Sequence, residues 1–140
     1  MTSEEMKVFL NRAFYADKKI AALNMLIAQT RERAQGLSRS SDGNLKGKSD
    51  SNNNSTESAL LRLAELEQQA QVQRVYAADV LLEIQQKIAL LKDDDFETVL
   101  THRFLLYNTI EQTAELMNYA PRTVRQKQKQ AIEKLCQLMP

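Results

Sequence analysis

The chain has 140 residues with 3 Gly, 2 Pro, no Trp and 43% apolar residues, a balance that favours helices over strands in one compact domain or two small units. Its formal net charge of +1 gives no overall attraction to a polyanion, its single cysteine excludes an internal disulfide, and one cysteine with one histidine cannot build a zinc finger. The first residues lack the apolar core of a signal peptide, and no apolar run approaches the roughly 20 residues that span a bilayer, so we expect a soluble cytoplasmic protein without a membrane partner.

The first predicted helix runs from about residue 3 to residue 35. Ser3 is its expected start, because Glu4 and Glu5 behind it favour the positive end of a helix dipole, and Gly36 is its expected end. Apolar residues recur at steps of three, four or seven, as on one face of a helix: Met6, Leu10, Ala13, Ile20, Leu23 and Ile27.

The composition changes abruptly in residues 36–56. All three glycines lie in this segment together with many serines, asparagines and aspartates, and only Leu37 and Leu45 are apolar. Such a segment cannot bury enough apolar surface to offset the loss of chain entropy on folding. The sequence therefore predicts a flexible linker at 36–56.

The second predicted long helix covers about residues 57–92, with Thr56 as its expected N-cap. Its apolar stripe begins with three leucines, is interrupted by Gln73, and comprises Leu60, Leu63, Leu66, Ala70, Ala77, Leu81, Ile84, Ile88 and Leu91. Two long amphipathic helices joined by a flexible linker predict a long helical hairpin within one chain. The same stripes could instead pair with a second copy of the chain, which predicts a homodimer.

Three shorter helical pieces are predicted in residues 96–140. The acidic run 93–95 ends the long helix and supplies the acidic start of the next piece, 96–107. Thr109 is the expected cap of a short helix over 110–117, and Pro121 begins the last helix, which runs to about Leu138. The fold class is therefore predicted as all-α, with residues 1–95 as two long helices and 96–140 as a separate domain.

Residues 110–135 have the spacing of a helix-turn-helix. Ala114 lies where two helices of that motif come closest, and Val124 is expected to point back at it. Asn118 occupies the turn position that needs a positive φ, which asparagine tolerates best among the non-glycine residues. Tyr119 is expected to insert into the core, and Pro121 suits the first helical turn because its missing N–H leaves no bond unmade.

The outward face of the last helix carries side chains that suit a DNA major groove. With Val124 facing inward, Arg122, Gln126 and Lys129 fall on the opposite side, because each residue advances the helix by about 100°. Arginine pairs with guanine, glutamine with adenine, and lysine neutralises phosphate. The predicted DNA-binding residues are Arg122, Thr123, Arg125, Gln126, Lys129 and Gln130. Only one acid, Glu133, was expected near the local basic cluster of Arg122, Arg125, Lys127, Lys129 and Lys134.

The stretch IEQTAELMNYAPRTVRQKQKQAIEKL resembles, without gaps, the helix-turn-helix of region four of bacterial primary sigma factors. The wider layout is similar to phage-encoded transcriptional regulators of the RinA and ArpU type. This resemblance implies a phage or prophage regulator that binds double-stranded DNA, and it leaves open whether the chain also contacts RNA polymerase. It also implies that Gln126 and Arg122 read bases and that Arg125 contacts phosphate or base. Pro121 replaces a base-contacting arginine, so the target sequence does not carry over, and Lys127 replaces an apolar residue and is expected to keep its ammonium in solvent.

Two other functions fit the same pattern. The chain could be a phage DNA-packaging subunit, similar to a small terminase, or a helical adaptor that docks RNA polymerase without binding DNA. An enzyme is not expected, because nothing pairs a nucleophile with a base, and no catalytic residue, metal or cofactor is predicted. His102 and Cys136 are expected in packing or surface roles, the acidic run 93–95 at a helix end, and Tyr107 and Tyr119 in the core.

Overall fold

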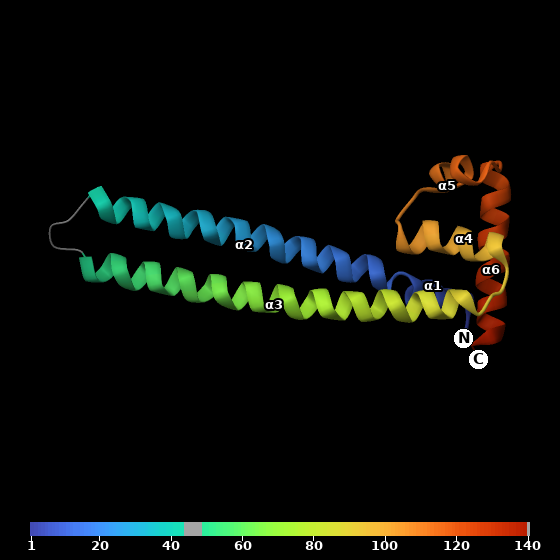
Figure 1. Cartoon of the computed structure of the whole chain (residues 1–140), viewed down its shortest axis with the longest axis horizontal. Helices are drawn as coiled ribbons and strands as arrows, with labels where there is room; N and C mark the ends of the chain where they lie inside the picture. The colour runs from blue at the N-terminus through green and yellow to red at the C-terminus, as the bar shows by residue number, and fades with distance from the viewer. Residues whose placement is uncertain (44–48, 140) are drawn as a thin grey trace. The chain divides into compact units, whose positions relative to one another are not determined.

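The computed structural model describes the backbone of residues 1–43 and 49–139 and the side chains of residues 1–36 and 55–139. This part of the chain is helical and contains no strand, so the predicted all-α class is confirmed (Figure 1). Its elements are α1 (Ser3–Leu10), α2 (Arg12–Gly43), α3 (Ser49–Ala89), α4 (Asp94–Leu100), the π-helical turn η1 (Thr101–Leu105), α5 (Ile110–Met117) and α6 (Pro121–Leu138).

The chain forms two compact units. Unit 1 comprises Met1–Asp17 and Tyr76–Pro140, and unit 2 comprises Lys18–Val75. Folding of residues 1–95 and 96–140 as separate domains stays a prediction, as does the arrangement of a hairpin followed by a DNA-binding helix-turn-helix. None of the described helices is long and apolar enough to cross a membrane.

The core of unit 1 contains side chains from both ends of the sequence, from α1 and from α6. Met6 and Leu10 of α1 are fully buried against the last turns of α3 and the middle of α6. The buried members of this cluster are Met6, Leu10, Ala13, Val80, Ile84, Ile88, Leu91, Leu100, Phe104, Leu105, Ala131, Ile132 and Leu135. Burial of apolar surface on this scale stabilises the unit that contains α6, since each fully buried large side chain contributes about 1.5–3 kcal/mol.

In unit 2, α2 and α3 lie side by side and run in opposite directions (Figure 1). Leu23 and Ile27 of α2 pack on Ala70 of α3, with two half-buried leucines at the edge, Leu63 and Leu66. Arg31 pairs with Glu67 at 2.9 Å, and Arg74 donates to the Asn24 side chain at 3.2 Å. The apolar stripe of α2 is therefore covered within the chain in this unit.

Several predicted helix limits are wrong. The start is as predicted, because α1 begins at Ser3, and its N-cap is Thr2, whose hydroxyl accepts from the Glu5 N–H at 3.2 Å. The first helix is interrupted at Asn11, where α1 ends and α2 begins one residue later. Gly36 does not end a helix: α2 continues to Gly43, because an exposed glycine costs a helix only about 1 kcal/mol relative to alanine.

Helices α2 and α3 extend into the predicted linker 36–56 from both sides. Helix α3 begins at Ser49, so Thr56 lies inside it and is not its N-cap. Serine and asparagine are weak helix formers and do not by themselves stop a helix. Residues 44–48, the middle of the predicted linker, lie outside the described residues, and the flexibility of the linker stays a prediction.

The apolar stripe of α3 is confirmed in large part. Ala70, Ala77, Ile84, Ile88 and Leu91 are buried, as predicted. Leu60 and Leu81 were expected on the same stripe but are exposed, at 52% and 40%. Val80 takes the buried position in place of Leu81, because a long helix of 3.6 residues per turn drifts away from a strict seven-residue repeat.

The first element before α5 differs from the predicted helix 96–107 at both ends, since α4 begins at Asp94 and ends at Leu100. Asp93 caps α4, with its carboxylate accepting from the Phe96 N–H at 3.1 Å. The predicted helix 96–107 is interrupted by η1, in which the Leu106 N–H donates to the Thr101 carbonyl at 3.0 Å. The wider turn buries Phe104 and Leu105 together and leaves Leu106 exposed.

Candidate nucleic-acid interface

The turn between α5 and α6 has the predicted backbone. Asn118 adopts the left-handed conformation, with φ 58° and ψ 39°, and ends α5. The next N–H, that of Tyr119, donates to the Ala114 carbonyl at 3.0 Å, which satisfies one of the free carbonyls at the helix end. Ala120 is extended and Pro121 opens α6 at its first position. These predictions for Asn118 and Pro121 are confirmed.

A small buried cluster holds α5 against α6. Ala114 of α5, Val124 of α6 and Val99 of α4 form it, and all three are at most 3% exposed. A larger side chain at position 114 would separate the two helices, because cores are packed to near-crystalline density. The predicted contact between Ala114 and Val124 is therefore confirmed, and it fixes which side of α6 faces outward.

The outward side of α6 carries the predicted DNA-binding residues. The side chains of Arg122, Arg125, Gln126, Lys129 and Gln130 are exposed, and Thr123 is half-buried. All six belong to α6, so a rigid element presents them together. Donors and acceptors of this kind match the edges of base pairs and the phosphates that border a major groove. Contact of these residues with DNA stays a prediction.

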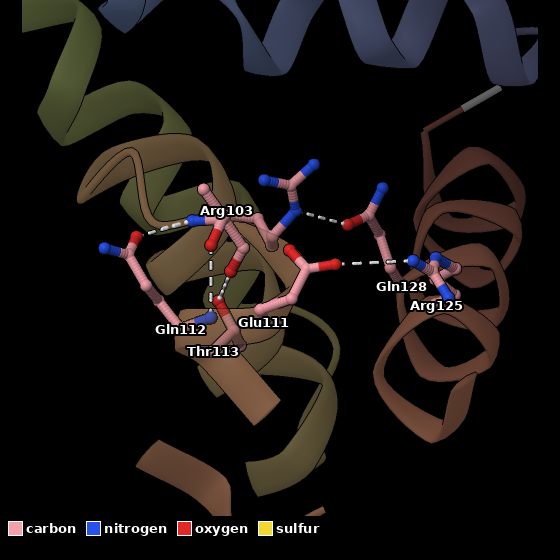
Figure 2. Close-up of polar contacts among 7 residues, drawn as sticks. Arg103, Glu111, Gln112, Thr113, Arg125 and Gln128 are labelled. Carbon is pink, nitrogen blue, oxygen red and sulfur yellow. Dashed lines mark hydrogen bonds and ion pairs between the residues drawn. The ribbon is translucent and has the colours of Figure 1, made fainter. Parts of the chain in front are cut away.

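Polar contacts join α6 to η1 and α5, which precede it in the chain (Figure 2). The Arg103 guanidinium of η1 donates to the Gln128 side chain at 2.9 Å and to the Asn108 carbonyl at 2.7 Å. Glu111 of α5 lies 3.5 Å from the Arg125 guanidinium, and both side chains are more than half exposed. Gln128 is half-buried, and its partner Arg103 lies in an element that the sequence pattern of α6 does not indicate.

The beginning of α5 is fixed by a reciprocal cap, also drawn in Figure 2. The Thr109 hydroxyl accepts from the Gln112 N–H at 3.1 Å, and the Gln112 side chain accepts from the Thr109 N–H at 2.9 Å. Thr113 is fully buried, and its hydroxyl donates to the Thr109 carbonyl at 2.9 Å. The prediction that Thr109 caps α5 is confirmed, and the motif contributes on the order of 1 kcal/mol to the helix.

The basic cluster on α6 is not opposed by Glu133 alone, so that prediction is wrong. Lys127 does not keep its ammonium free in solvent: its side chain is 25% exposed and lies 3.1 Å from the Asp95 carboxylate at the start of α4. The Lys134 ammonium donates to the Leu91 carbonyl at 2.7 Å. Arg125 is paired with Glu111. Three of the five cations are therefore bound within unit 1, because acids and carbonyls distant in sequence meet them there.

Tyr119 lies on the surface and not in the core, which corrects the prediction. Its ring is 36% exposed, its hydroxyl donates to Asp95 at 2.7 Å, and the Lys127 ammonium lies 5.3 Å from the ring centre. The hydrogen bonds from Tyr119 and Lys127 lower the pKa of Asp95 below its ordinary value of 3.8. The bond to Asp95 raises the pKa values of Tyr119 and Lys127. The turn is thus held by a polar contact, since a phenol hydroxyl needs a partner.

Tyr107 is also at the surface, at 37% exposure, and not in the core as predicted. Its ring meets the Phe14 ring edge-on at 5.3 Å between centres, and its hydroxyl donates to the Asp17 carboxylate. Partial burial is the largest cause that raises the pKa of Tyr107, and the hydrogen bond to Asp17 raises it further. Neither tyrosine offers a free ring on α6 for stacking with a base.

The remaining candidate residues take part in packing. His102 is half-buried, and its Nδ1 lies 3.1 Å from the Asn108 side-chain amide. Cys136 is half-buried against the core of unit 1, as predicted. Within the described residues, no group of three or more His, Cys, Asp or Glu side chains could hold a metal ion.

Comparisons with protein-family models, with curated proteins and with solved structures give no match to this chain. The resemblance of residues 110–135 to sigma region four, and of the whole layout to phage regulators of the RinA and ArpU type, therefore stays a prediction from the sequence.

Proposed function

We propose that the chain is a sequence-specific DNA-binding transcription regulator, phage or prophage encoded, that reads the major groove of double-stranded DNA with α6. The observation that supports this most is the two-sided character of α6. Val124, Ala131 and Leu135 are fully buried, and the opposite face carries Arg, Gln and Lys side chains as far as Gln130, followed by one acid, Glu133. A helix of this length and polarity fits a major groove about 12 Å wide.

Two free cations on this face support the proposal further. Among the described residues, Arg122 and Lys129 have no carboxylate within ion-pair distance, although the other basic side chains of α6 are bound. They lie near Gln126, on the same outward side. A guanidinium, an amide and an ammonium on one helix face supply two base-reading groups and one phosphate-neutralising group.

Selection of bound sequences from random duplex DNA tests the proposal. Wild-type protein should enrich a defined sequence, and the double variant R122A/Q126A should lose that preference, since each lost base contact costs about 1–3 kcal/mol. The matched control is R33A/Q68A, which removes the same two residue types from exposed positions in unit 2. A double variant that enriches the same sequence as wild type would show that α6 is not the reading helix.

Two further measurements, the salt dependence of duplex binding and light scattering, separate the two alternative functions predicted from the sequence. An adaptor that docks RNA polymerase without DNA would give no salt-dependent binding to any duplex. A DNA-packaging subunit would form a ring-like assembly in solution, which light scattering detects. A regulator that uses a homodimer would give a two-chain mass by the same measurement and would enrich a two-fold symmetric site.

A further inference from the structure

A pocket lies where α1 meets the flank of α6, both in unit 1. It has a volume of about 290 Å³ and is lined by Ser3, Lys7, Arg125, Gln128, Lys129, Ile132 and Glu133. Three of these residues are cations, two more carry neutral hydrogen-bond donors, and one is an acid. Lys7 stands 118 positions away from Arg125 in the sequence, so nothing in the α6 pattern points to it.

The residues that line the pocket carry three positive charges and one negative charge, that of Glu133, so their net positive charge favours an anion. Lys7 is 48% exposed and lies 3.9 Å from Glu4, and Arg125 lies 3.5 Å from Glu111. Both contacts are between exposed side chains, and such pairs contribute little to stability and exchange readily for a stronger partner. A phosphate oxygen can replace either carboxylate, because both are ionised acceptors of charge-assisted hydrogen bonds and the exposed pair that is given up contributes little.

The position of the pocket fits the DNA backbone. Arg125 lies on the flank of α6 between its outward face and the side that packs on α1, and Lys129 lies at the adjoining edge of the outward face. When a helix lies in the major groove, its flanks face the sugar-phosphate strands that border the groove. Lys7 of α1 would meet one of those strands beside Lys129.

From this geometry we infer that the pocket between α1 and α6 binds a phosphate group, and that Lys7 supplies a DNA-backbone contact from outside the helix-turn-helix. This inference rests on the proposed function for the source of the phosphate, a phosphodiester of the bound duplex. The contact positions α6 on DNA and carries no base preference of its own.

The salt dependence of DNA binding tests the role of Lys7. Each neutralised phosphate contributes about 0.9 to the slope of log affinity against log salt. K7Q should lower the magnitude of that slope by about 0.9 and leave the selected sequence unchanged, and K7R should restore the slope. The matched control is K19Q, which removes one positive charge from unit 2 and should leave the slope as in wild type. If K7Q and K19Q give the same slope as wild type, the inference is overturned while DNA binding stands.

A second arm uses inorganic phosphate, followed by NMR on wild-type protein and K7Q. The expected result is a titrating shift at Lys7, Arg125 and Lys129 that K7Q abolishes. If the protein binds no DNA but shows this shift, the pocket is supported, its phosphate comes from a free ligand, and the proposed function fails. If it shows neither DNA binding nor the shift, both proposals are overturned.

Discussion

Replacement of Val124 by alanine tests the packing that orients α6. The Val124 side chain is fully buried among Ala114 and Val99, so the change removes two methyl groups from a closed cluster. Transfer of two methyl-sized groups accounts for roughly 1.6 kcal/mol at about 0.8 kcal/mol each. A residual cavity of roughly 50 Å³ adds about 1.2 kcal/mol at about 24 cal/mol per Å³, because the helices around it collapse only in part. We expect a loss of about 2–3 kcal/mol in the free energy of unfolding.

Urea unfolding followed by circular dichroism measures this loss, and in thermal unfolding it corresponds to roughly 6–9 °C for a chain of this size. Q126A is the matched control, since Gln126 is on the same helix but exposed. It should change the free energy of unfolding by less than about 0.5 kcal/mol and still weaken specific DNA binding. A V124A variant as stable as wild type would mean that α5 and α6 do not pack through this cluster.

Three more outcomes follow from the site. T109A should cost about 0.5–2 kcal/mol in urea unfolding, because it removes the hydroxyl that accepts from the Gln112 N–H and keeps only the bond donated by the backbone N–H of residue 109. T109S should restore most of that loss, and equal stability of all three proteins would contradict the cap. NMR titration should place the pKa of Asp95 below 3.8, and Y119F should raise that pKa because it removes the hydrogen bond from Tyr119. The stabilisation from Asp95 is therefore present above the pKa of the unfolded chain and is lost as pH falls through the lower pKa of the folded protein. An unchanged pKa of Asp95 in Y119F would refute the contact. E133Q should bind DNA roughly two- to fivefold more tightly at low salt, because it removes the acid from the pocket beside Lys129; weaker binding would place that part of α6 away from phosphate.

Local features around the candidate site could be predicted from the sequence because each depends on neighbouring residues. Thr109 caps α5, Asn118 takes the left-handed turn and Pro121 opens α6, and each position is decided by backbone chemistry within a few residues. The burial of Ala114 and Val124 follows from the period of the helix once the turn is placed. These predictions needed no knowledge of the rest of the chain.

Contacts between distant residues could not be predicted in the same way. The pairing of Asp95 with Lys127 and the bond from Lys134 to the Leu91 carbonyl join elements whose relative placement depends on the whole core of unit 1. The prediction that Glu133 alone opposes the basic cluster on α6 was wrong for this reason. The pocket residue Lys7 was missed because its sequence context shows only an exposed helical lysine.

The predicted ends of the long helices were wrong for a different reason. Gly36 and the Ser- and Asn-rich residues after it lower helix propensity, but propensity is a weak preference that a long neighbouring helix overrides. The π-helical turn η1 has no sequence signal of its own, because Leu105 and Leu106 satisfy the apolar pattern equally well. Packing alone decides that Leu105 is buried and Leu106 is exposed.

Under the proposed function, the contacts of Lys127 and Lys134 within unit 1 affect the affinity of α6 for DNA. Lys127 and Lys134 no longer offer free charge to phosphate, which weakens non-specific attraction to DNA. The same contacts hold one flank of α6 against α4 and the end of α3, while Val124 holds it against α5. A helix fixed in this way loses little conformational freedom when it binds, and only its outward side chains must become ordered, at about 0.5–1.5 kcal/mol each. In the proposed complex, the part of the affinity that is independent of DNA sequence is therefore lower. The part that depends on base contacts by Arg122 and Gln126 is correspondingly more important.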